Sequence, residues 1–493
     1  MDLSQAYSMM GADLGATLSL VIVALAGLAV VVFDAFKPRH TATPWLAGLA
    51  LAAGFGVEVM NISQPEGLAW YDMLRTGGSA AFVNALVLGS GALSVVLSVP
   101  YLKRIGHNIG EVYAMILFAT VGMLVLGASN NLVTVFVGLE TMSICLYVLT
   151  GFVRSEAGST ESALKYFLLG AFSTGFFLYG IALLYGATGS MQLDQIQAAA
   201  AEGTGIMFWG GVSLLLVGFL FKVSAAPFHM WTPDVYQGAP TTITGFMSTA
   251  SKAAAFAALV VVLWKALPAE RWADVLAVFA VITMVLGNVI ALSQQNVKRM
   301  LAYSSIAHAG YVLVGLASGT EAGYAGALFY LMVYTIMNIG AFGVLALLEW
   351  DGKEGSEQTL DSLAGVGYRK PLLGWTMAVF MFSLSGFPPL AGFLGKWAVF
   401  APAIEADLIW LAIIGVLTSA ASAYYYLRVL VVFFMKPADD ESPAASASFD
   451  IPRASALVLI ACVILLVVFG VTTFALDLTQ GFFADGAMAQ LAG

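Results

Sequence analysis

Charged residues are scarce in this sequence. Only 10% of its 493 residues carry a charge, 60% are hydrophobic, and the mean hydropathy is +0.90. Ordinary globular domains have about 25% charged residues, so the composition excludes a water-soluble protein. The formal net charge is −9 and no stretch is strongly basic. This excludes nucleic acid as a partner, because nothing in the chain would neutralise its phosphates.

Cysteine and histidine are scarce as well. The two cysteines, Cys145 and Cys462, lie far apart in apolar segments, so we expect buried side chains and neither a disulfide framework nor an iron–sulfur cluster. The four histidines are too scattered to pair as haem ligands: His40, His107, His229 and His308. A glycine-rich phosphate loop needs a preceding strand, and we predict no strands. We therefore expect no metal and no cofactor in this chain.

Long apolar segments are abundant. Runs of about 20 apolar residues, enough to cross a bilayer as a helix, follow one another along nearly the whole chain, whereas the alternating strands of a membrane barrel do not occur. The N-terminus lacks the basic flank of a cleavable signal, so we expect the first helix to be retained. We predict an all-α polytopic membrane protein with about 14 transmembrane helices, near residues 13–36, 42–62, 79–102, 108–128, 130–153, 160–187, 205–226, 241–267, 272–294, 298–318, 322–349, 371–402, 405–435 and 453–477.

Basic residues in the predicted loops are unevenly divided between the two sides of the membrane. One side has twelve: Lys37, Arg39, Lys103, Arg104, Arg154, Lys298, Arg299, Lys353, Arg369, Lys370, Lys436 and Arg453. The other side has only Arg75 and Arg271. Because Lys and Arg concentrate in cytoplasmic loops, the first side is predicted to be cytoplasmic and both termini to lie outside.

The remaining six basic residues fall within predicted helices: Lys165, Lys222, Lys252, Lys265, Lys396 and Arg428. Lys265 and Arg428 are near helix ends, and we expect both to extend to the interface. Lys165 lies at the start of its helix, and its side chain either extends to the membrane interface as well or has a buried partner. The other three have apolar neighbours on both sides and need partners inside the protein: Lys222, Lys252 and Lys396.

One acid, Glu140, is predicted well inside a helix. A carboxylate at that depth is costly unless it is paired, so we expect an ion pair with Lys222 or Lys165. The alternative is a protonated glutamate that is hydrogen-bonded in the core.

Prolines interrupt two predicted helices, the seventh at Pro227 and the twelfth at Pro388 and Pro389, each near a buried lysine. Proline frees backbone carbonyls, which are tolerated at membrane depth only against protein or a hydrated cavity. The two breaks are five helices apart, as an inverted repeat of helices 4–8 and 9–13 would place them. The predicted divisions are an N-terminal three-helix segment, two five-helix units, and a final loop and helix: 1–107, 108–267, 268–435 and 436–493.

Two histidines are candidates for proton transfer. Imidazole titrates nearest neutral pH, so His308 and His229 either relay protons or simply pack in the core. Tyr303, Ser304 and Ser305 precede His308. Their hydroxyls either hold water between titrating groups or join helices.

Several strings resemble the N subunits of bacterial respiratory complex I, the proton-translocating NADH:quinone oxidoreductase: GLETMSICLYVL, ESALKYFLLGAFSTG, FKVSAAPFHMWTPDVYQGAPT, QQNVKRMLAYSSIAHAGY and LSGFPPLAGFLGKW. The resemblance covers roughly residues 108–435. It implies that Glu140, Lys222, Lys252 and Lys396 occupy the family's proton-translocating positions. Lysine at 396 favours subunit N over subunit M, where that position is an acid, and the chain lacks the long C-terminal extension of subunit L.

The resemblance implies a non-redox subunit of a translocase in the bacterial inner membrane. Its partners would be lipids, protons and the other membrane subunits, while NADH, flavin, iron–sulfur clusters and quinone would be bound by those other subunits. Glu140 would act as a switchable anion beside Lys222, and the proton would pass through Lys252 to Lys396. Two alternatives remain open, a cation/proton antiporter subunit and a scaffold with structural ion pairs.

Overall fold

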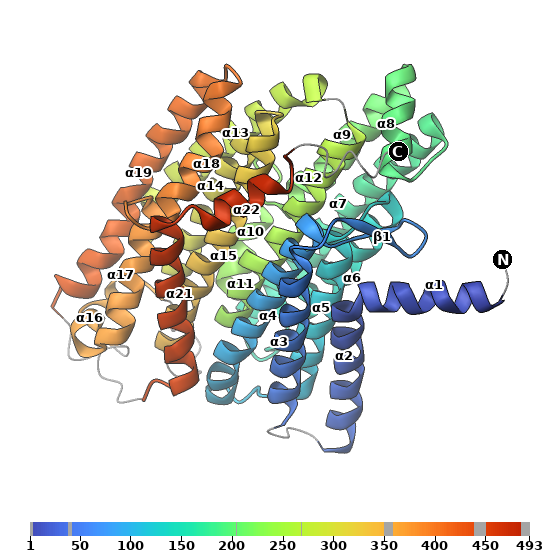
Figure 1. Cartoon of the computed structure of the whole chain (residues 1–493). Helices are drawn as coiled ribbons and strands as arrows, with labels where there is room; N and C mark the ends of the chain where they lie inside the picture. Colours follow the sequence, from blue (N-terminus) through green and yellow to red (C-terminus); the bar gives the residue numbers. More distant parts are fainter. Residues whose placement is uncertain are drawn as a thin grey trace.

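The computed structural model describes residues 3–37, 42–203, 205–267, 269–349, 358–437 and 450–484, and these form a bundle of helices (Figure 1). Arg39, His40 and Lys353, considered above, lie outside the described residues, as does the side chain of Arg271. The helices are α1 (Leu3–Ala16), α2 (Leu18–Phe36), α3 (Thr43–Asn61), α4 (Gly78–Arg104), α5 (Gly110–Gly127), α6 (Leu132–Thr150), α7 (Ala157–Thr188), α8 (Leu193–Glu202), α9 (Ile206–Lys222), α10 (Trp231–Gly238), α11 (Thr241–Phe246), η1 (Met247–Ser251), α12 (Lys252–Ala266), α13 (Ala269–Ser293), α14 (Val297–Ala317), α15 (Glu321–Leu348), η2 (Asp361–Leu363), α16 (Val366–Arg369), α17 (Pro371–Ser385), α18 (Ala391–Glu405), α19 (Ile409–Phe434), α21 (Arg453–Val471) and α22 (Phe474–Gly481).

The predicted all-α membrane fold is confirmed. In the described ranges, 12 helical segments are long and apolar enough to cross a membrane, and α11, η1 and α12 together form one of them. Two shorter apolar helices, α9 and α17, each end where irregular chain interrupts the helix. The predicted total of about fourteen spans stays a prediction.

The first helix was predicted to be continuous over residues 13–36, and this is wrong because two separate helices, α1 and α2, divide the segment. They meet at Thr17, whose backbone is not helical, and α1 lies crosswise to α2 and projects from the bundle (Figure 1). The Thr17 hydroxyl donates to the Asp13 carbonyl at 2.7 Å and accepts from Trp70 Nε1 at 3.1 Å. A hydroxyl that bonds back to the preceding turn often bends a helix.

The prediction of no strands is wrong for one short hairpin between α3 and α4. Strands β1 (Gly67–Ala69) and β2 (Leu74–Thr76) pair antiparallel. The hairpin carries Arg75, which is buried and donates to the Gly127 carbonyl at 3.1 Å and lies 3.5 Å from the Glu66 carboxylate. A buried charge is retained only when it is paired and hydrogen-bonded, so Arg75 fastens this loop to α5.

Neighbouring helices approach closely where glycines face each other. A Cβ atom added to Gly122 on α5 would lie 2.4 Å from the backbone nitrogen of Met142 on α6, and one added to Gly138 on α6 would lie 2.6 Å from the nitrogen of Leu126 on α5. Small residues at such contacts are typical of helix pairs in membranes, where van der Waals packing replaces the hydrophobic driving force. These glycines therefore set the position of α6.

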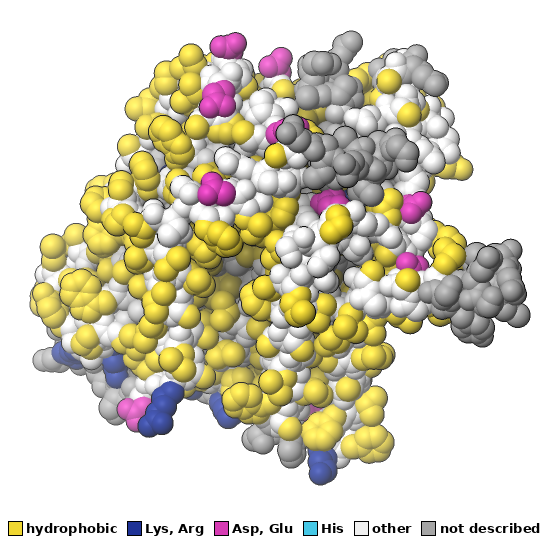
Figure 2. Space-filling model, viewed as in Figure 1, with side chains coloured by type: hydrophobic (Ala, Val, Ile, Leu, Met, Phe, Trp, Pro, Cys, Tyr) yellow, Lys and Arg dark blue, Asp and Glu magenta, His cyan; other side chains and the backbone are white. Residues whose placement is uncertain are grey.

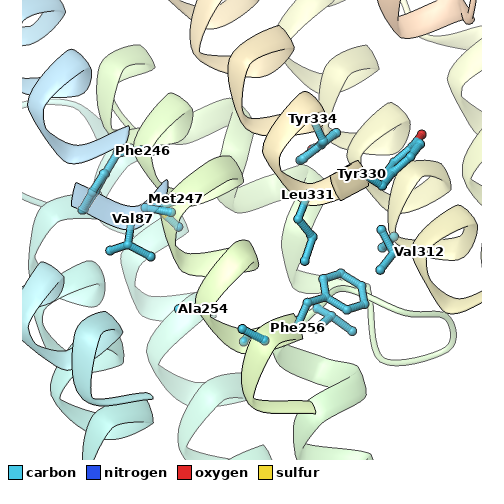
Figure 3. Close-up of a cluster of buried hydrophobic side chains, with 14 of the residues drawn as sticks. Val87, Phe246, Met247, Ala254, Phe256, Val312, Tyr330, Leu331 and Tyr334 are labelled. Carbon is cyan, nitrogen blue, oxygen red and sulfur yellow. The ribbon is translucent and has the colours of Figure 1, made fainter. Parts of the chain in front are cut away.

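The segment formed by α11, η1 and α12 lies in the middle of the protein. The most apolar 18-residue stretches of this segment and of α15 are completely buried. Figure 3 shows Val87 of α4 on one side of the segment, and Val312 of α14 with Tyr330 of α15 on the other. A polar side chain on this segment therefore contacts protein and not lipid.

Charge is separated between the two ends of the bundle. Figure 2 shows Lys and Arg gathered along one end and acidic side chains mainly toward the other. The first end, called the basic end below, carries Lys103 and Arg104 at the end of α4 and Lys298 and Arg299 at the start of α14. This separation agrees with the uneven division of loop charges in the sequence.

Candidate functional site

Two broken helices organise the site, as the prolines predicted. Helix α9 ends at Lys222 and α10 begins at Trp231, while α17 ends at Ser385 and α18 begins at Ala391. The first break begins well before Pro227. Lys222 is consequently the last residue of a half-helix, where the negative end of the helix dipole favours a cation.

The Lys222 side chain is 5% exposed and is held by hydroxyl groups of α6. Its Nζ donates to Ser143 Oγ at 2.7 Å and to Tyr147 Oη at 3.4 Å. Within the described residues, no carboxylate lies in salt-bridge range of Lys222, Lys252 or Lys396. The hydrogen-bond acceptors of these three ammonium groups are all neutral oxygens.

The expected ion pair of Glu140 with Lys222 or Lys165 is wrong. Glu140 is half-buried, and its Oε1 accepts a hydrogen bond from Thr174 of α7 at 2.8 Å. It interacts with Lys222 only electrostatically, without contact. Glu140 and Ser143 are one turn apart on α6, and Lys222 extends to Ser143 instead.

Lys165 does not lie with the other candidate lysines. Its side chain is 42% exposed and binds Glu161 at 2.7 Å and Asp234 at 2.8 Å. Arg299, which begins α14 at the basic end, binds the same Asp234 at 2.7 Å. Lys165 is part of an end cluster, and exposed ion pairs of this kind stabilise a fold by about 0–1 kcal/mol.

Lys252 lies at the centre of the bundle and is 2% exposed. Its Nζ donates to the Ser305 carbonyl at 3.0 Å and to the Ser305 hydroxyl. The residue directly follows η1, a turn of π-helix. Such turns are frequent at functional sites, and the sequence contains no proline or glycine pair here that would have predicted one.

Lys396 lies in the second turn of α18, its side chain reaches back to the second break, and it is 6% exposed. Its Nζ donates to the carbonyls of Leu384 and Ser385 at 3.0 and 2.8 Å and to Ser419 Oγ at 2.7 Å. Both carbonyls belong to the last turn of α17, where backbone acceptors have no partner in the helix. The break therefore supplies the acceptors that hold this ammonium group.

His308 is bonded through both of its ring nitrogens. Nδ1 lies 2.7 Å from the Tyr330 hydroxyl, and Nε2 lies 3.0 Å from the Tyr426 hydroxyl, which also bonds Ser304. Ser304 thus joins the site as a candidate. Tyr303 does not join the site. It is half-buried, and the Arg299 guanidinium carbon lies over its ring, 5.9 Å from the ring centre.

Tyrosines connect His308 to two of the lysines. Lys252 Nζ lies 5.9 Å from the Tyr334 ring centre, which lies 5.2 Å from that of His308. On the other side, the Tyr311 ring centre is 5.5 Å from His308 and 5.3 Å from Lys396 Nζ. The central row is the name used below for Lys252, His308 and Lys396 together with the tyrosines around them: Tyr311, Tyr330, Tyr334 and Tyr426.

Sequence reasoning missed the tyrosines of this row. Tyr330 and Tyr334 are one turn apart on α15, and Tyr426 belongs to a run of three tyrosines on α19. The one-turn spacing shows that Tyr330 and Tyr334 share a helix face. Only the assembled bundle shows that this face is turned toward His308.

The other polar candidates have different surroundings. His229 lies in the first break and is 9% exposed, and its Nδ1 has no hydrogen-bond partner among the residues that the structure describes. Lys265 and Arg428 were expected at the membrane interface, but Lys265 is 5% exposed and binds Asn130 at 3.3 Å, and Arg428 donates to the Leu292 carbonyl at 3.3 Å. Both hold helix ends together.

Glu140 is not the only acid inside a helix. Glu58 on α3 is 5% exposed and accepts hydrogen bonds from Ser19 and Asn84. It lies between α2 and α4, away from the central row. Within the described ranges, no three His, Cys, Asp or Glu side chains come together as metal ligands.

Known proteins resemble this chain over most of its length. The family model of the NADH:quinone oxidoreductase/Mrp antiporter transmembrane proteins matches residues 129–422. The chain is 59% identical to NADH-quinone oxidoreductase subunit N of Salinibacter ruber over 99% of both chains. It is 47% identical to that of Trichlorobacter lovleyi over 90% of this chain and 91% of the relative.

Solved structures agree with these relatives. A chain of respiratory complex I from Thermus thermophilus with bound aureothin is 36% identical, with a TM-score of 0.80 over 93% of this chain and 98% of that one. A chain of the Mrp complex from Dietzia matches in fold alone, with a TM-score of 0.82 at 19% identity over 96% of this chain and 98% of that one. On the strength of its sequence and its fold, the chain belongs to the NADH-quinone oxidoreductase subunit N family, within the NADH:quinone oxidoreductase/Mrp antiporter proteins.

Proposed function

We propose that the chain translocates protons as a non-redox subunit of NADH:quinone oxidoreductase. The observation that carries the proposal is the set of buried lysines without carboxylate partners, two of which are joined to His308 through tyrosines. Ionisable residues inside a membrane protein typically mark a proton or ion pathway. NADH, flavin, iron–sulfur clusters and quinone would be bound by partner subunits.

Proton movement would follow from changing the distance between Glu140 and Lys222. An ammonium group held only by Ser143 and Tyr147 keeps its proton less tightly than one beside a carboxylate. A signal that moves Glu140 toward Lys222 would load the lysine, and separation would release the proton toward Lys252. Moving one charge against the membrane potential takes about 2.3 kcal/mol per 100 mV, which a buried ion pair can supply.

His308 is suited to pass the proton on to Lys396. One ring nitrogen can accept a proton while the other gives one up, and each nitrogen already faces a tyrosine hydroxyl. Lys396 would then release the proton outward. We further propose that the basic end faces the cytoplasm, since Lys and Arg concentrate there, and that both termini are outside the bacterial inner membrane.

The two broken helices also support a division into repeated units. In both, a half-helix ends and irregular chain follows, and the side chain of a buried lysine reaches the break, from the helix before it for Lys222 and from the helix after it for Lys396. We propose units at residues 108–267 and 268–435, flanked by 1–107 and 436–493. Inverted units of this kind place binding groups near the middle of the membrane.

Glu140→Ala and Lys222→Ala test the function directly. Each change removes one member of the proposed switch, so proton pumping is expected to fall several-fold. Pumping is measured by dye quenching in inverted membrane vesicles that oxidise NADH, together with the rate of NADH oxidation. Lys165→Ala is the matched control, because its exposed pairs lie in the end cluster, and near wild-type pumping is expected. Full pumping in both switch variants would refute the proposal.

Tyr426→Phe is expected to slow pumping more mildly. The change removes one hydroxyl that bonds both His308 Nε2 and Ser304, and leaving a buried polar atom unpaired costs about 1–3 kcal/mol. Tyr113→Phe is the control, since this buried tyrosine of α5 donates its hydroxyl to Asn108 Oδ1 at 2.6 Å and has no contact with His308 or Tyr426. Pumping per NADH oxidised, compared between the two variants, checks the prediction. Equal effects would show that Tyr426 acts only in packing.

A cation/proton antiporter subunit is the second candidate function, because the fold matches a chain of the Mrp complex. The identity of 59% to a subunit N favours the first. Extraction in mild detergent distinguishes them. Flavin and iron absorbance co-purifying with the chain supports the respiratory complex, and their absence together with sodium-dependent proton release supports the antiporter.

A further inference from the structure

Hydroxyl side chains form a stripe along α4 that neither the switch nor the central row uses. Ser90, Ser94, Ser98 and Tyr101 follow one another every three to four residues, so they lie on one face of the helix. All four are buried, none more than 3% exposed. The contacts below show that this face is turned toward α11, η1 and α15. The stripe therefore extends inward from the basic end.

At the basic end the stripe meets a carboxylate. The Tyr101 hydroxyl donates to Glu349 Oε1 at 3.1 Å and accepts from the Thr241 backbone nitrogen at 3.3 Å. Thr241 Oγ1 and Gln358 Nε2 donate to Glu349 Oε2. Lys298 lies within electrostatic range. Glu349 is half-exposed at the end of α15, so it has access to solvent and to the stripe.

Above this carboxylate lies a small cavity whose lining is mainly apolar. Its volume is about 10 Å³, close to that of one water, and its two polar side chains are Ser94 and Thr242. Thr242 Oγ1, and Ser98 Oγ one turn along α4 from Ser94, are buried without a hydrogen-bond partner among the described residues. Buried hydroxyls are nearly always hydrogen-bonded, if not to protein then to water. These two atoms thus indicate bound water.

The stripe continues to the level of Lys252. The hydroxyls of Ser90 and Thr249 lie 2.8 Å apart, and Thr249 belongs to η1, the turn that directly precedes Lys252. Helix α15 packs against η1 and carries Asn338, which is fully buried and whose amide atoms form no well-aligned hydrogen bond among the described residues. The Tyr334 hydroxyl, one turn away on α15, lies near Asn338 and Ser305 without a well-aligned hydrogen bond to either, and its ring centre is 5.9 Å from Lys252 Nζ.

We propose that these groups form a hydrated inlet that carries protons from Glu349, between α4, α11 and α15, to Lys252. Glu349 collects the proton, water held by Thr242 and the α4 serines passes it inward, and Asn338 with Tyr334 orients the last water beside the lysine. The inlet rests on the proposed function, for which it supplies the entry half. It also gives a role to buried hydroxyls that have no structural partner.

Thr242→Val tests the inlet with a near-isosteric change. The Thr242 hydroxyl has no hydrogen-bond partner among the described residues, so its loss leaves none of them unpaired. If Thr242 has only a structural role, the variant is expected to pump normally and to unfold at an equal or higher temperature. The inlet predicts that stability is kept while proton pumping and coupled NADH oxidation fall several-fold. Thr120→Val is the matched control, since that buried hydroxyl on α5 donates only to its own helix, to the Ile116 carbonyl at 2.8 Å.

A second measurement does not depend on turnover. Ser94→Cys places a thiol in the cavity. Its S–H proton is expected to exchange with deuterium from water faster than that of the buried Thr120→Cys control thiol, as followed by the infrared S–H stretch of the purified complex. Normal pumping in Thr242→Val together with equally slow exchange of the Ser94→Cys and Thr120→Cys thiols overturns the inlet. If Glu140→Ala and Lys222→Ala still lower pumping in that case, the proposed function stands and only the entry route is wrong.

Discussion

Replacing Lys252 by methionine is expected to stop proton translocation through this chain while leaving the fold at least as stable as before. Lys252 is where the inlet meets the central row, and its ammonium group has only Ser305 oxygens as hydrogen-bond partners. Removing ions from water costs several kcal/mol each, and a hydrophobic residue of similar volume in place of a buried charge is often neutral or stabilising. Methionine has a similar length and no charge.

The measurement is proton pumping in inverted vesicles together with the unfolding temperature of the purified complex. Lys265→Met is the matched control, because it makes the same change on the same helix. That lysine binds Asn130 and lies 3.8 Å from Asp194, so the control is expected to pump normally and to lose some stability. Normal pumping in Lys252→Met would remove the lysine from the pathway, and a lowered unfolding temperature would assign it a structural role.

Replacing Gly138 by leucine is expected to prevent the subunit from accumulating in the membrane. A Cβ atom at this position would lie 2.6 Å from the Leu126 backbone nitrogen and 2.9 Å from the Gly122 carbonyl oxygen. Overpacking usually costs about 1–3 kcal/mol, but those estimates assume that side chains can rearrange. Here the atoms in the way are backbone, so α5 and α6 must separate. Helix α6 carries Ser143 and Tyr147, and the Lys222 site would be lost with it.

Gly175→Leu on α7 is the control, because a Cβ atom there has no neighbour within 4 Å. Leucine is a better helix former than glycine by roughly 0.8–1 kcal/mol, so this variant is expected to accumulate normally. Subunit levels in isolated membranes, and the fraction assembled in the complex, check both variants. Equal amounts of the Gly138→Leu and wild-type subunits would show that the close approach of α5 and α6 is not required.

The elements of the site that could be predicted are those with a local cause. A lysine with apolar residues on both sides is expected to be buried, and a proline tends to interrupt a helix, although Pro100 and Pro402 lie inside α4 and α18 without ending them. For this reason the burial of Lys222, Lys252 and Lys396 and both breaks follow from short stretches of sequence. The partner of Lys222 could not be predicted in the same way. Glu140, Ser143 and Tyr147 are spaced by three and four residues on α6, so they share a face, and the place where α9 ends decides which of them the lysine contacts.

The sequence by itself determined that this chain spans a membrane many times, which loops are basic, and that Lys222, Lys252 and Lys396 are buried, because these properties follow from composition and apolar length. Only the tertiary structure decided how those charges are stabilised. It turned the tyrosines of three helices toward His308, placed the freed carbonyls of α17 around Lys396, and aligned the α4 serines with Glu349 and Lys252. Apart from the Tyr311–His308 contact within α14, these contacts join residues of different helices, and the packing of whole helices is what brings them together.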